Sequence, residues 1–255
     1  MNAHDILTRI MNIDMNTDNK KTLKEITKEC IDGNGDNVTN SRMCIIDAEF
    51  RRGFTMLEKH PKSITFFGSA RLSKESEYYK PVRDLAEKVA NLGYAVVTGG
   101  GHGLMGAANQ GAYEADLGTS LGINIDLPME QTLNEYLNDS IDFHHFFSRK
   151  VILAYAAEAY VYTPGGFGTL DEMFEILTLK QTKKIPDTPI ILYGSKFWKP
   201  LEEYFRQVLL AEGNETIHPD DLNLYVITDS DEEVLQIIKD APVRTDMSNK
   251  HHLGH

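Results

Sequence analysis

Residues 94–109 read YAVVTGGGHGLMGAAN, an apolar run rich in β-branched residues that ends in three glycines and leads into a helical pattern. The first part predicts a buried strand, and residues 104–116 predict a helix. Glycine lets the backbone approach a ligand closely, and free N–H groups at a helix start attract anions. The stretch therefore predicts a strand–loop–helix unit that can hold a phosphate.

The same alternation of strand and helix continues along most of the chain. Short apolar strands are predicted at 64–68, 94–101, 119–125, 159–166, 188–194 and 224–228. Helices are predicted at 78–93, 104–116, 146–157, 170–182, 199–213 and 231–240. Alternating strands and helices form a parallel sheet covered on both faces. We predict an α/β fold, a Rossmann-like doubly wound parallel sheet with helices on both faces, plus an N-terminal helical extension.

The two ends of the chain lie outside this alternation. Residues 1–60 are expected to form the helical extension, with a polar, Asn-rich first part and a stronger amphipathic pattern at 45–59. That segment could pack on the core domain or on a second subunit. Residues 61–242 are expected to be the Rossmann-like domain. Residues 243–255 are expected to be a tail, whose histidines suit a frayed end better than a metal site.

The composition of the chain indicates which kinds of partner and which cellular compartment to expect. The net charge of −12 and the pI near 5.2 disfavour general binding to nucleic acid or anionic membranes, which need basic surfaces. No apolar run approaches the roughly 18 residues of a membrane span. Cys30 and Cys44 form no CxxC pair, and we expect two reduced thiols. These features predict a cytoplasmic protein with neither nucleic-acid nor membrane partners.

Three loops follow predicted strands and carry the candidate ligand residues. They are GSAR at 68–71, the glycine loop at 98–109, and TPGGFGTLDEMFE at 163–175. Ligands of parallel sheets bind beyond the carboxyl ends of the strands, so we expect these loops to meet. In the third loop Thr169 is expected to cap a helix or face the ligand. The flexible positions expected to adopt positive φ or approach the ligand closely are Gly165, Gly166 and Gly168.

The second loop also contains the pattern GxGxxG at residues 101–106. Asp126 follows twenty residues after Gly106, as in dinucleotide-binding proteins. The loop follows a second predicted strand, however, whereas the dinucleotide pattern opens the first strand–helix unit. Binding of NAD or NADP stays open as an alternative.

Charged residues near these loops have both a purely structural and a functional interpretation. Asp171 and Glu172 could complement a helix dipole, or one of them could face the ligand, because successive helical positions point about 100° apart. Arg149 and Lys150 could be solvated cations or part of the site. His144 and His145 have no further ligand at metal-binding spacing, so no metal is expected.

The order GSAR, GGGHGLMGAAN, FFSRK and PGGFGTLDE resembles the "lonely guy" (LOG) family over residues 61–240. Members are cytokinin-activating phosphoribohydrolases and bacterial nucleotide nucleosidases, many long labelled lysine decarboxylases. The family pattern PGGxGTxxE is complete here and ends at Glu172. The resemblance implies hydrolysis of a nucleoside 5′-monophosphate, such as AMP or an N6-modified AMP, to free base and ribose 5-phosphate.

The resemblance also implies roles for particular residues. Glu172 would serve the ribose and the attacking water, Arg149 would act on the leaving base or the transition state, and Lys150 and Asp171 would be supporting residues. The full set expected to bind substrate is Gly68, Ser69, Arg71, Gly100, Gly101, Met105, Arg149, Gly165, Gly166, Gly168, Thr169 and Glu172. Neither a cofactor nor a metal is required. The resemblance implies a homodimer or larger homo-oligomer, and it leaves the base open.

A protein that carries or senses nucleotides, with the same fold, is the alternative to an enzyme. The two are distinguished by the acid, because a pure phosphate binder has no need of Glu172 beside its phosphate loop.

Overall fold

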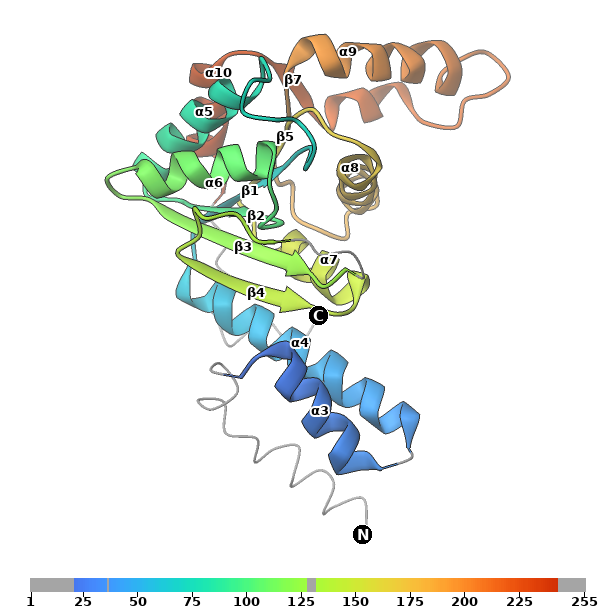
Figure 1. Cartoon of the computed structure of the whole chain (residues 1–255). Helices are drawn as coiled ribbons and strands as arrows, with labels where there is room; N and C mark the ends of the chain where they lie inside the picture. The colour runs from blue at the N-terminus through green and yellow to red at the C-terminus, as the bar shows by residue number, and fades with distance from the viewer. Residues whose placement is uncertain (1–20, 36, 128–131, 243–255) are drawn as a thin grey trace.

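The computed structural model describes residues 21–35, 37–127 and 132–242, and shows a seven-stranded parallel sheet (Figure 1). The strand order is β4-β3-β2-β1-β5-β6-β7. The strands are β1 Ser63–Phe67, β2 Ala95–Thr98, β3 Thr119–Ile125, β4 Asp139–Phe143, β5 Ala159–Tyr162, β6 Ile190–Tyr193 and β7 Val226–Thr228. The predicted α/β, doubly wound parallel fold is confirmed.

Helices cover both faces of the sheet. One face carries α5 (Tyr79–Asn91), α6 (Leu104–Glu114) and α10 (Asp231–Asp240). The other face carries α4 (Val38–Lys59), α7 (Phe146–Tyr155), α8 (Phe167–Gln181) and α9 (Ser195–Tyr204). Each face has its own hydrophobic core, which explains why the central strands β1, β2, β5 and β6 are buried at every position.

Strand β5 illustrates how one short sequence serves both cores. Tyr160 and Tyr162 belong to the α7–α8 core, whereas Ala159 and Val161 belong to the α5–α6 core. Side chains alternate across a strand, and all four are buried. The run AYVY therefore has to be apolar throughout, and this is the signal by which the strand was predicted.

Strand β4 was missed by the sequence analysis. It pairs in parallel with β3, with Ile123 opposite Ile141, and forms one edge of the sheet. Only Ile141 and Phe143 of its five residues are buried. An edge strand needs apolar residues on one face only, so DSIDF lacks the apolar run that marks the inner strands.

The N-terminal region adds a helical hairpin of α3 (Leu23–Asn34) and α4, which extends from the domain beside β4 (Figure 1). Cys30 and Cys44 are joined in a disulfide within this hairpin. The expectation of two reduced thiols is therefore wrong: antiparallel packing of two adjacent helices brings the cysteines together, although 14 positions separate them in sequence.

The apolar face of α4 is covered by its own chain. Ile45 packs with Ile26 and Cys30 of α3, and Met56 and Leu57 enter the core beneath the sheet. Of the two expectations for residues 45–59, packing on the core is the one observed. Because this face is already covered, it gives no support to packing of the helix on a second subunit.

The helix predicted at 199–213 is divided. Helix α9 begins earlier, at Ser195, and ends at Tyr204, where a π-helical turn, η1 (Phe205–Leu209), continues it. A 3₁₀ turn, η2 (Pro219–Asn223), precedes β7. Among the helices described, none is long and apolar enough to cross a membrane. The expectations for residues 1–20 and for the tail 243–255 lie outside the described residues.

Candidate functional site

The three loops meet where the strand order reverses, between β1 and β5. Two backbone hydrogen bonds join them. The N–H of Ser69, after β1, donates to Pro164 O after β5 at 3.0 Å, and Ser69 O accepts from the N–H of Leu104, at the start of α6, at 2.8 Å. Ligands of doubly wound sheets bind at such a reversal. The loops that sequence analysis singled out thus form one continuous surface.

Two glycines, which carry no side chain, make this close approach of the loops possible. A Cβ on Gly68 would collide with the Thr163 hydroxyl and lie 2.9 Å from Leu104 Cβ. Gly103, with φ of 67°, would place a Cβ against Ser69 O and 2.7 Å from the Ala70 carbonyl carbon. Both glycines are therefore required by the junction of the loops.

The glycine loop after β2 is held by a buried polar network. Thr98 Oγ1 donates to Asn109 Oδ1 at 2.6 Å and accepts from the N–H of Gly100 at 2.9 Å. The Asn134 amide donates to Gly100 O, Gly101 O and Asn109 Oδ1, at 2.9–3.1 Å. Gly100 and Gly101 are buried, and these hydrogen bonds engage several of their backbone groups, so the two glycines shape the loop.

The three side chains of this network, Thr98, Asn109 and Asn134, were not predicted as site residues. Thr98 and Asn109 lie in the stretch quoted first, where an amide directly after the apolar run LMGAA was the available signal for Asn109. Asn134 follows a segment with no motif, and only the fold brings it to the loop.

The third loop differs from expectation at its helix start. Helix α8 begins at Phe167, with Gly166 as its N-cap, so Thr169 is inside the first turn and is not the cap. Gly165, Gly166 and Gly168 do not adopt positive φ. Gly165 is required for another reason: a Cβ there would collide with the Thr169 side chain. Gly166 and Gly168 are exposed, and nothing lies within 4 Å of where a Cβ would be.

Glu172 lies in the second turn of α8 and is buried. Burial raises the pKa of Glu172 to about 7, although the positive charges of Arg149 and Lys150 act to lower it. A carboxyl group with a pKa near neutrality can both accept and release a proton at physiological pH.

Arg149 projects from the first turn of α7 into the same part of the site as Glu172. Its Nε donates to Ile123 O, within β3, at 2.8 Å. Its Nη2 lies only 2.5 Å from where Gly99 would carry a Cβ, and Met105 Sδ lies beside the same position. Burial lowers the pKa of Arg149, and Glu172 partly reverses this. Gly99, which we did not predict, makes room for the guanidinium.

Lys150 bridges α7 and α8. Its Nζ lies 2.9 Å from an Asp171 oxygen and 2.6 Å from a Glu175 oxygen. Burial lowers the pKa of Lys150, but the hydrogen bonds to Glu175 and Asp171 outweigh this and raise it overall. This arrangement accounts for Lys150 and Asp171 as a clamp between the two helices that carry Arg149 and Glu172.

The remaining predicted residue, Arg71, is exposed, and its backbone N–H donates to Ser69 Oγ at 3.0 Å. In the described part of the chain, no three His, Cys, Asp or Glu residues gather as they would around a metal ion. His145 instead contacts Glu49 of α4, with 3.0 Å between Nδ1 and Oε2.

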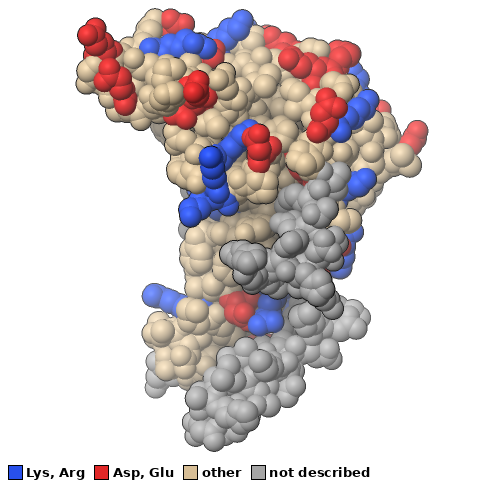
Figure 2. All heavy atoms as spheres, turned by 180° about the vertical axis from the view of Figure 1, so that it is seen from behind, with Lys and Arg blue, Asp and Glu red and all other residues tan. Residues whose placement is uncertain are grey.

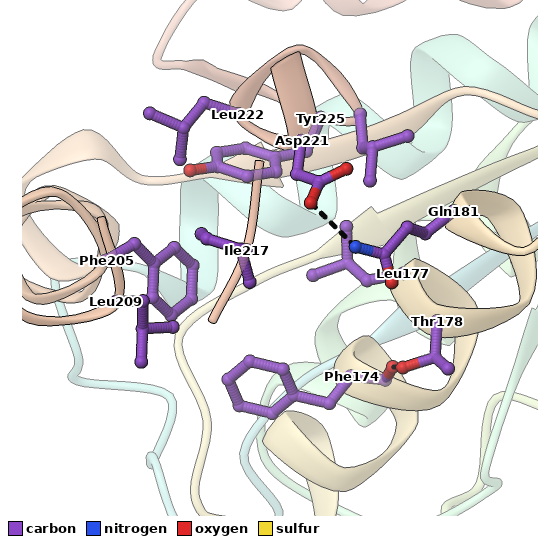
Figure 3. Close-up of a pocket in the computed structure, with 11 residues that line it drawn as sticks. Phe174, Leu177, Thr178, Gln181, Phe205, Leu209, Ile217, Asp221, Leu222 and Tyr225 are labelled. Carbon is purple, nitrogen blue, oxygen red and sulfur yellow. Dashed lines mark hydrogen bonds between the residues drawn. The ribbon is translucent and has the colours of Figure 1, made fainter. Parts of the chain in front are cut away.

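A separate pocket of about 110 Å³ lies between α8 and the η1 and η2 turns (Figure 3). Its walls are mainly apolar, and a hydrogen bond from Gln181 to Asp221 of 2.7 Å crosses one side (Figure 3). None of the predicted site residues lines it. The face in Figure 2 carries interspersed acidic and basic side chains, so its charge does not single out another site.

Proteins of known sequence that are similar to this chain include cytokinin riboside 5′-monophosphate phosphoribohydrolases. A Rhodococcoides fascians protein named cytokinin riboside 5′-monophosphate phosphoribohydrolase is 26% identical over 147 residues, which is 56% of this chain and 74% of the relative. An Arabidopsis thaliana protein of the same name is 27% identical over 181 residues, 69% of this chain and 76% of the relative.

Solved structures with the same fold include proteins of other names. An X-ray structure from a structural-genomics consortium has a TM-score of 0.54 and 27% identity, over 70% of this chain and 98% of its own. The molybdenum cofactor binding protein of Rippkaea orientalis has a TM-score of 0.51 and 22% identity, over 70% and 96%.

The family described as "possible lysine decarboxylase" matches residues 105–238, just over half of the chain. The match includes Arg149, Glu172 and the whole PGGxGTxxE pattern. The chain therefore belongs to this family, the LOG family.

Proposed function

We propose that this protein hydrolyses the N-glycosidic bond of a nucleoside 5′-monophosphate, to give free base and ribose 5-phosphate. The observation that carries the proposal is the pairing of a buried carboxyl group of raised pKa, Glu172, with the Arg149 guanidinium beside the glycine loops. The names of the relatives support the same reaction class.

The reaction places opposite electrostatic demands on the two ends of one substrate. Cleavage at C1′ develops positive charge on the ribose, which the ionised Glu172 would stabilise while accepting a proton from the attacking water. The bond from C1′ to the base nitrogen breaks, and the base leaves with its electron pair and takes up a proton. Arg149 would stabilise the charge on the departing base. Thr169 and the exposed glycines of the third loop would hold the phosphate.

The direct test is incubation of the purified protein with AMP, GMP, CMP, UMP and isopentenyl-AMP, separately and without added metal, followed by chromatography. Release of base and ribose 5-phosphate from any of them is the expected result, and the relative rates identify the preferred base. Adenosine, which lacks the phosphate, should react far more slowly, because binding energy at the phosphate helps to drive the reaction at C1′. Equal rates on AMP and adenosine would contradict the phosphate assignment.

The same assay separates the enzyme from a carrier. The solved structures of similar fold include molybdenum cofactor carrier and binding proteins. If every nucleotide stays intact while one of them raises the melting temperature, the protein binds nucleotides without hydrolysing them and the proposed activity is wrong.

A further inference from the structure

Glu49 is a buried carboxylate outside the residues used above. It lies in the middle of α4, and its side chain is completely inaccessible to solvent. Its oxygens accept hydrogen bonds from four donors, all within residues 144–148. These are the N–H groups of His144 and His145 (3.2 Å for His145), the ring Nδ1 of His145 at 3.0 Å, and Ser148 Oγ at 2.6 Å.

The two backbone contacts act at the N-cap of α7 and at the residue before it. The N-cap of α7 is His145, whose side chain makes no capping hydrogen bond. Backbone N–H groups at a helix start need acceptors, and a negative charge there interacts favourably with the helix dipole. Glu49, 96 positions before His145 in sequence, accepts hydrogen bonds from the N–H of this N-cap residue and of His144, and it places a carboxylate at this end of the helix.

Helix α4 is packed tightly against α7 and the core, so it can fix the position of groups that bind to it. Gly53, one turn after Glu49, approaches α7 so closely that a Cβ would lie 2.5 Å from Ile152 Cγ1 and 3.1 Å from Phe143 Cζ. Met56 and Leu57 anchor the end of the helix in the core. Glu49 is therefore fixed relative to both α7 and β4.

The helix start that Glu49 holds carries Arg149. Ser148, which donates to Glu49, directly precedes Arg149, and the two side chains point about 100° apart on the helix. One anchors α7 to α4 while the other reaches Ile123 O and the Gly99 backbone. A change in the first turn of α7 would consequently move the guanidinium.

We propose that Glu49 is a positioning residue for the reaction: by holding the first turn of α7 it fixes Arg149 in the site, so the N-terminal hairpin is part of the catalytic apparatus. This rests on the proposed function for its effect on turnover. The structural part of the proposal, that Glu49 holds the start of α7, does not depend on the proposed function.

The test is a double-mutant cycle on the full chain with Glu49→Ala, Arg149→Ala and the double variant. Single-turnover rates with the best monophosphate keep slow variants measurable. We expect Glu49→Ala to lower the rate constant by about tenfold or more, since small displacements of a catalytic group are costly, with a smaller change in KM. In the Arg149→Ala background the same substitution should have little further effect. An equal loss in both backgrounds, or no loss in the single variant, overturns the proposal.

Two further variants control the interpretation. Glu49→Gln keeps an oxygen for the backbone N–H groups and should recover most of the rate lost in Glu49→Ala. Asp47→Asn changes a half-exposed acid on the same helix that pairs with Arg51, and should leave the rate unchanged. If Glu49→Ala does not fold, Ser148→Ala replaces it: a loss of about threefold that vanishes with Arg149→Ala supports the proposal, and the same loss in both backgrounds overturns it.

Amide hydrogen exchange separates this inference from the proposed function. If the parent protein cleaves no monophosphate, the proposed function fails, whereas Glu49 is then judged by exchange. Faster exchange at residues 146–149 in Glu49→Ala, with α8 unchanged, supports the holding of α7. Unchanged exchange in α7 overturns it.

Discussion

At the residue scale, the site depends on a carboxyl group kept away from water. Glu172 is only 7% exposed, and burial outweighs the two nearby cations in setting its pKa near 7. A carboxylate in water would be fully ionised at that pH and a weaker base. The burial of Glu172 within α8 therefore makes it a stronger base than the same residue would be at a helix surface.

Replacing Glu172 by Gln tests this residue directly. The variant keeps the shape of the side chain but cannot accept a proton, so hydrolysis of the preferred monophosphate should fall by at least about a hundredfold. Binding of the monophosphate, measured by calorimetry, should be retained. Unchanged turnover would remove Glu172 from the mechanism.

The raised pKa of Glu172 also predicts how activity depends on pH. If the ionised form is required, kcat/KM of the parent protein should rise as pH increases through about 7 and level off above. The measurement is a profile of kcat/KM from pH 5 to pH 9. A flat profile across neutrality would show that another group, or none, limits the reaction.

The same pKa links Glu172 to stability. Its folded pKa of about 7 lies above the ordinary value of 4.5, so the folded state binds the proton more tightly, and stability contributed by this group is lost as pH rises from about 4.5 to 7. Glu172→Gln should therefore be more stable than the parent at pH 8, by up to about 3 kcal/mol, and show no such advantage below pH 4.5. Urea denaturation at the two pH values measures this, and a pH-independent difference would contradict it.

At the element scale, the joining of α6 to the loop after β1 organises the site. Gly103 ends the glycine loop with a positive φ, against the backbone of residues 69 and 70. This leaves the N–H of Leu104 to donate to Ser69 O. The start of α6 is thus engaged by protein, and the exposed start of α8 is the better candidate for an anion.

Gly103→Ala should disturb this junction. Both the positive φ and the collision with Ser69 O oppose a side chain, so the free energy of unfolding should fall by about 2 kcal/mol or more, and the affinity for AMP should fall as well. Gly33→Ala is the matched control, because it lies within α3 with nothing within 4 Å. It should leave stability unchanged or raise it by up to about 1 kcal/mol. Similar changes in both variants, measured by urea denaturation, would argue against a special role for Gly103.

At the scale of the whole molecule, aromatic side chains lie exposed around the site. Phe167 is 92% exposed, Phe146 56% and Phe147 50%, and the three belong to the helix starts that carry Glu172 and Arg149. Exposed aromatic residues are typical of protein interfaces. These aromatic residues support the predicted homo-oligomer. The apolar face of α4 does not, because it is covered within the chain.

A homodimer or larger assembly is therefore the expected state in solution. Light scattering after size-exclusion chromatography should give at least twice the chain mass of 28.8 kDa. Phe167→Ser should shift the protein toward the monomer if this surface is the interface, whereas Val38→Ser, at an exposed position of α4, should not. A monomer at all concentrations would refute the prediction.

Much of the fold could be predicted because its signals are local. Strand β5 and the helices around it follow from apolar patterns within a few residues, and the loop positions follow from the strands. β4 could not be predicted in this way, since an edge strand buries only alternate residues. The start of α8 was placed three residues late, because glycines that suggested an open loop continue directly into the helix.

The sequence by itself determined the alternation of strands and helices, the parallel sheet, the three loops and the resemblance that singles out Arg149 and Glu172. Each of these depends on neighbours in the chain or on the two periods of regular structure. Only the tertiary structure decided the clamping of the glycine loop by Asn134, the room that Gly99 leaves for Arg149, the raised pKa of Glu172, the disulfide and the contact of Glu49 with α7. These are contacts and burial between distant segments, such as Glu49 and Ser148, 99 positions apart, and no local pattern records which distant group a side chain will meet.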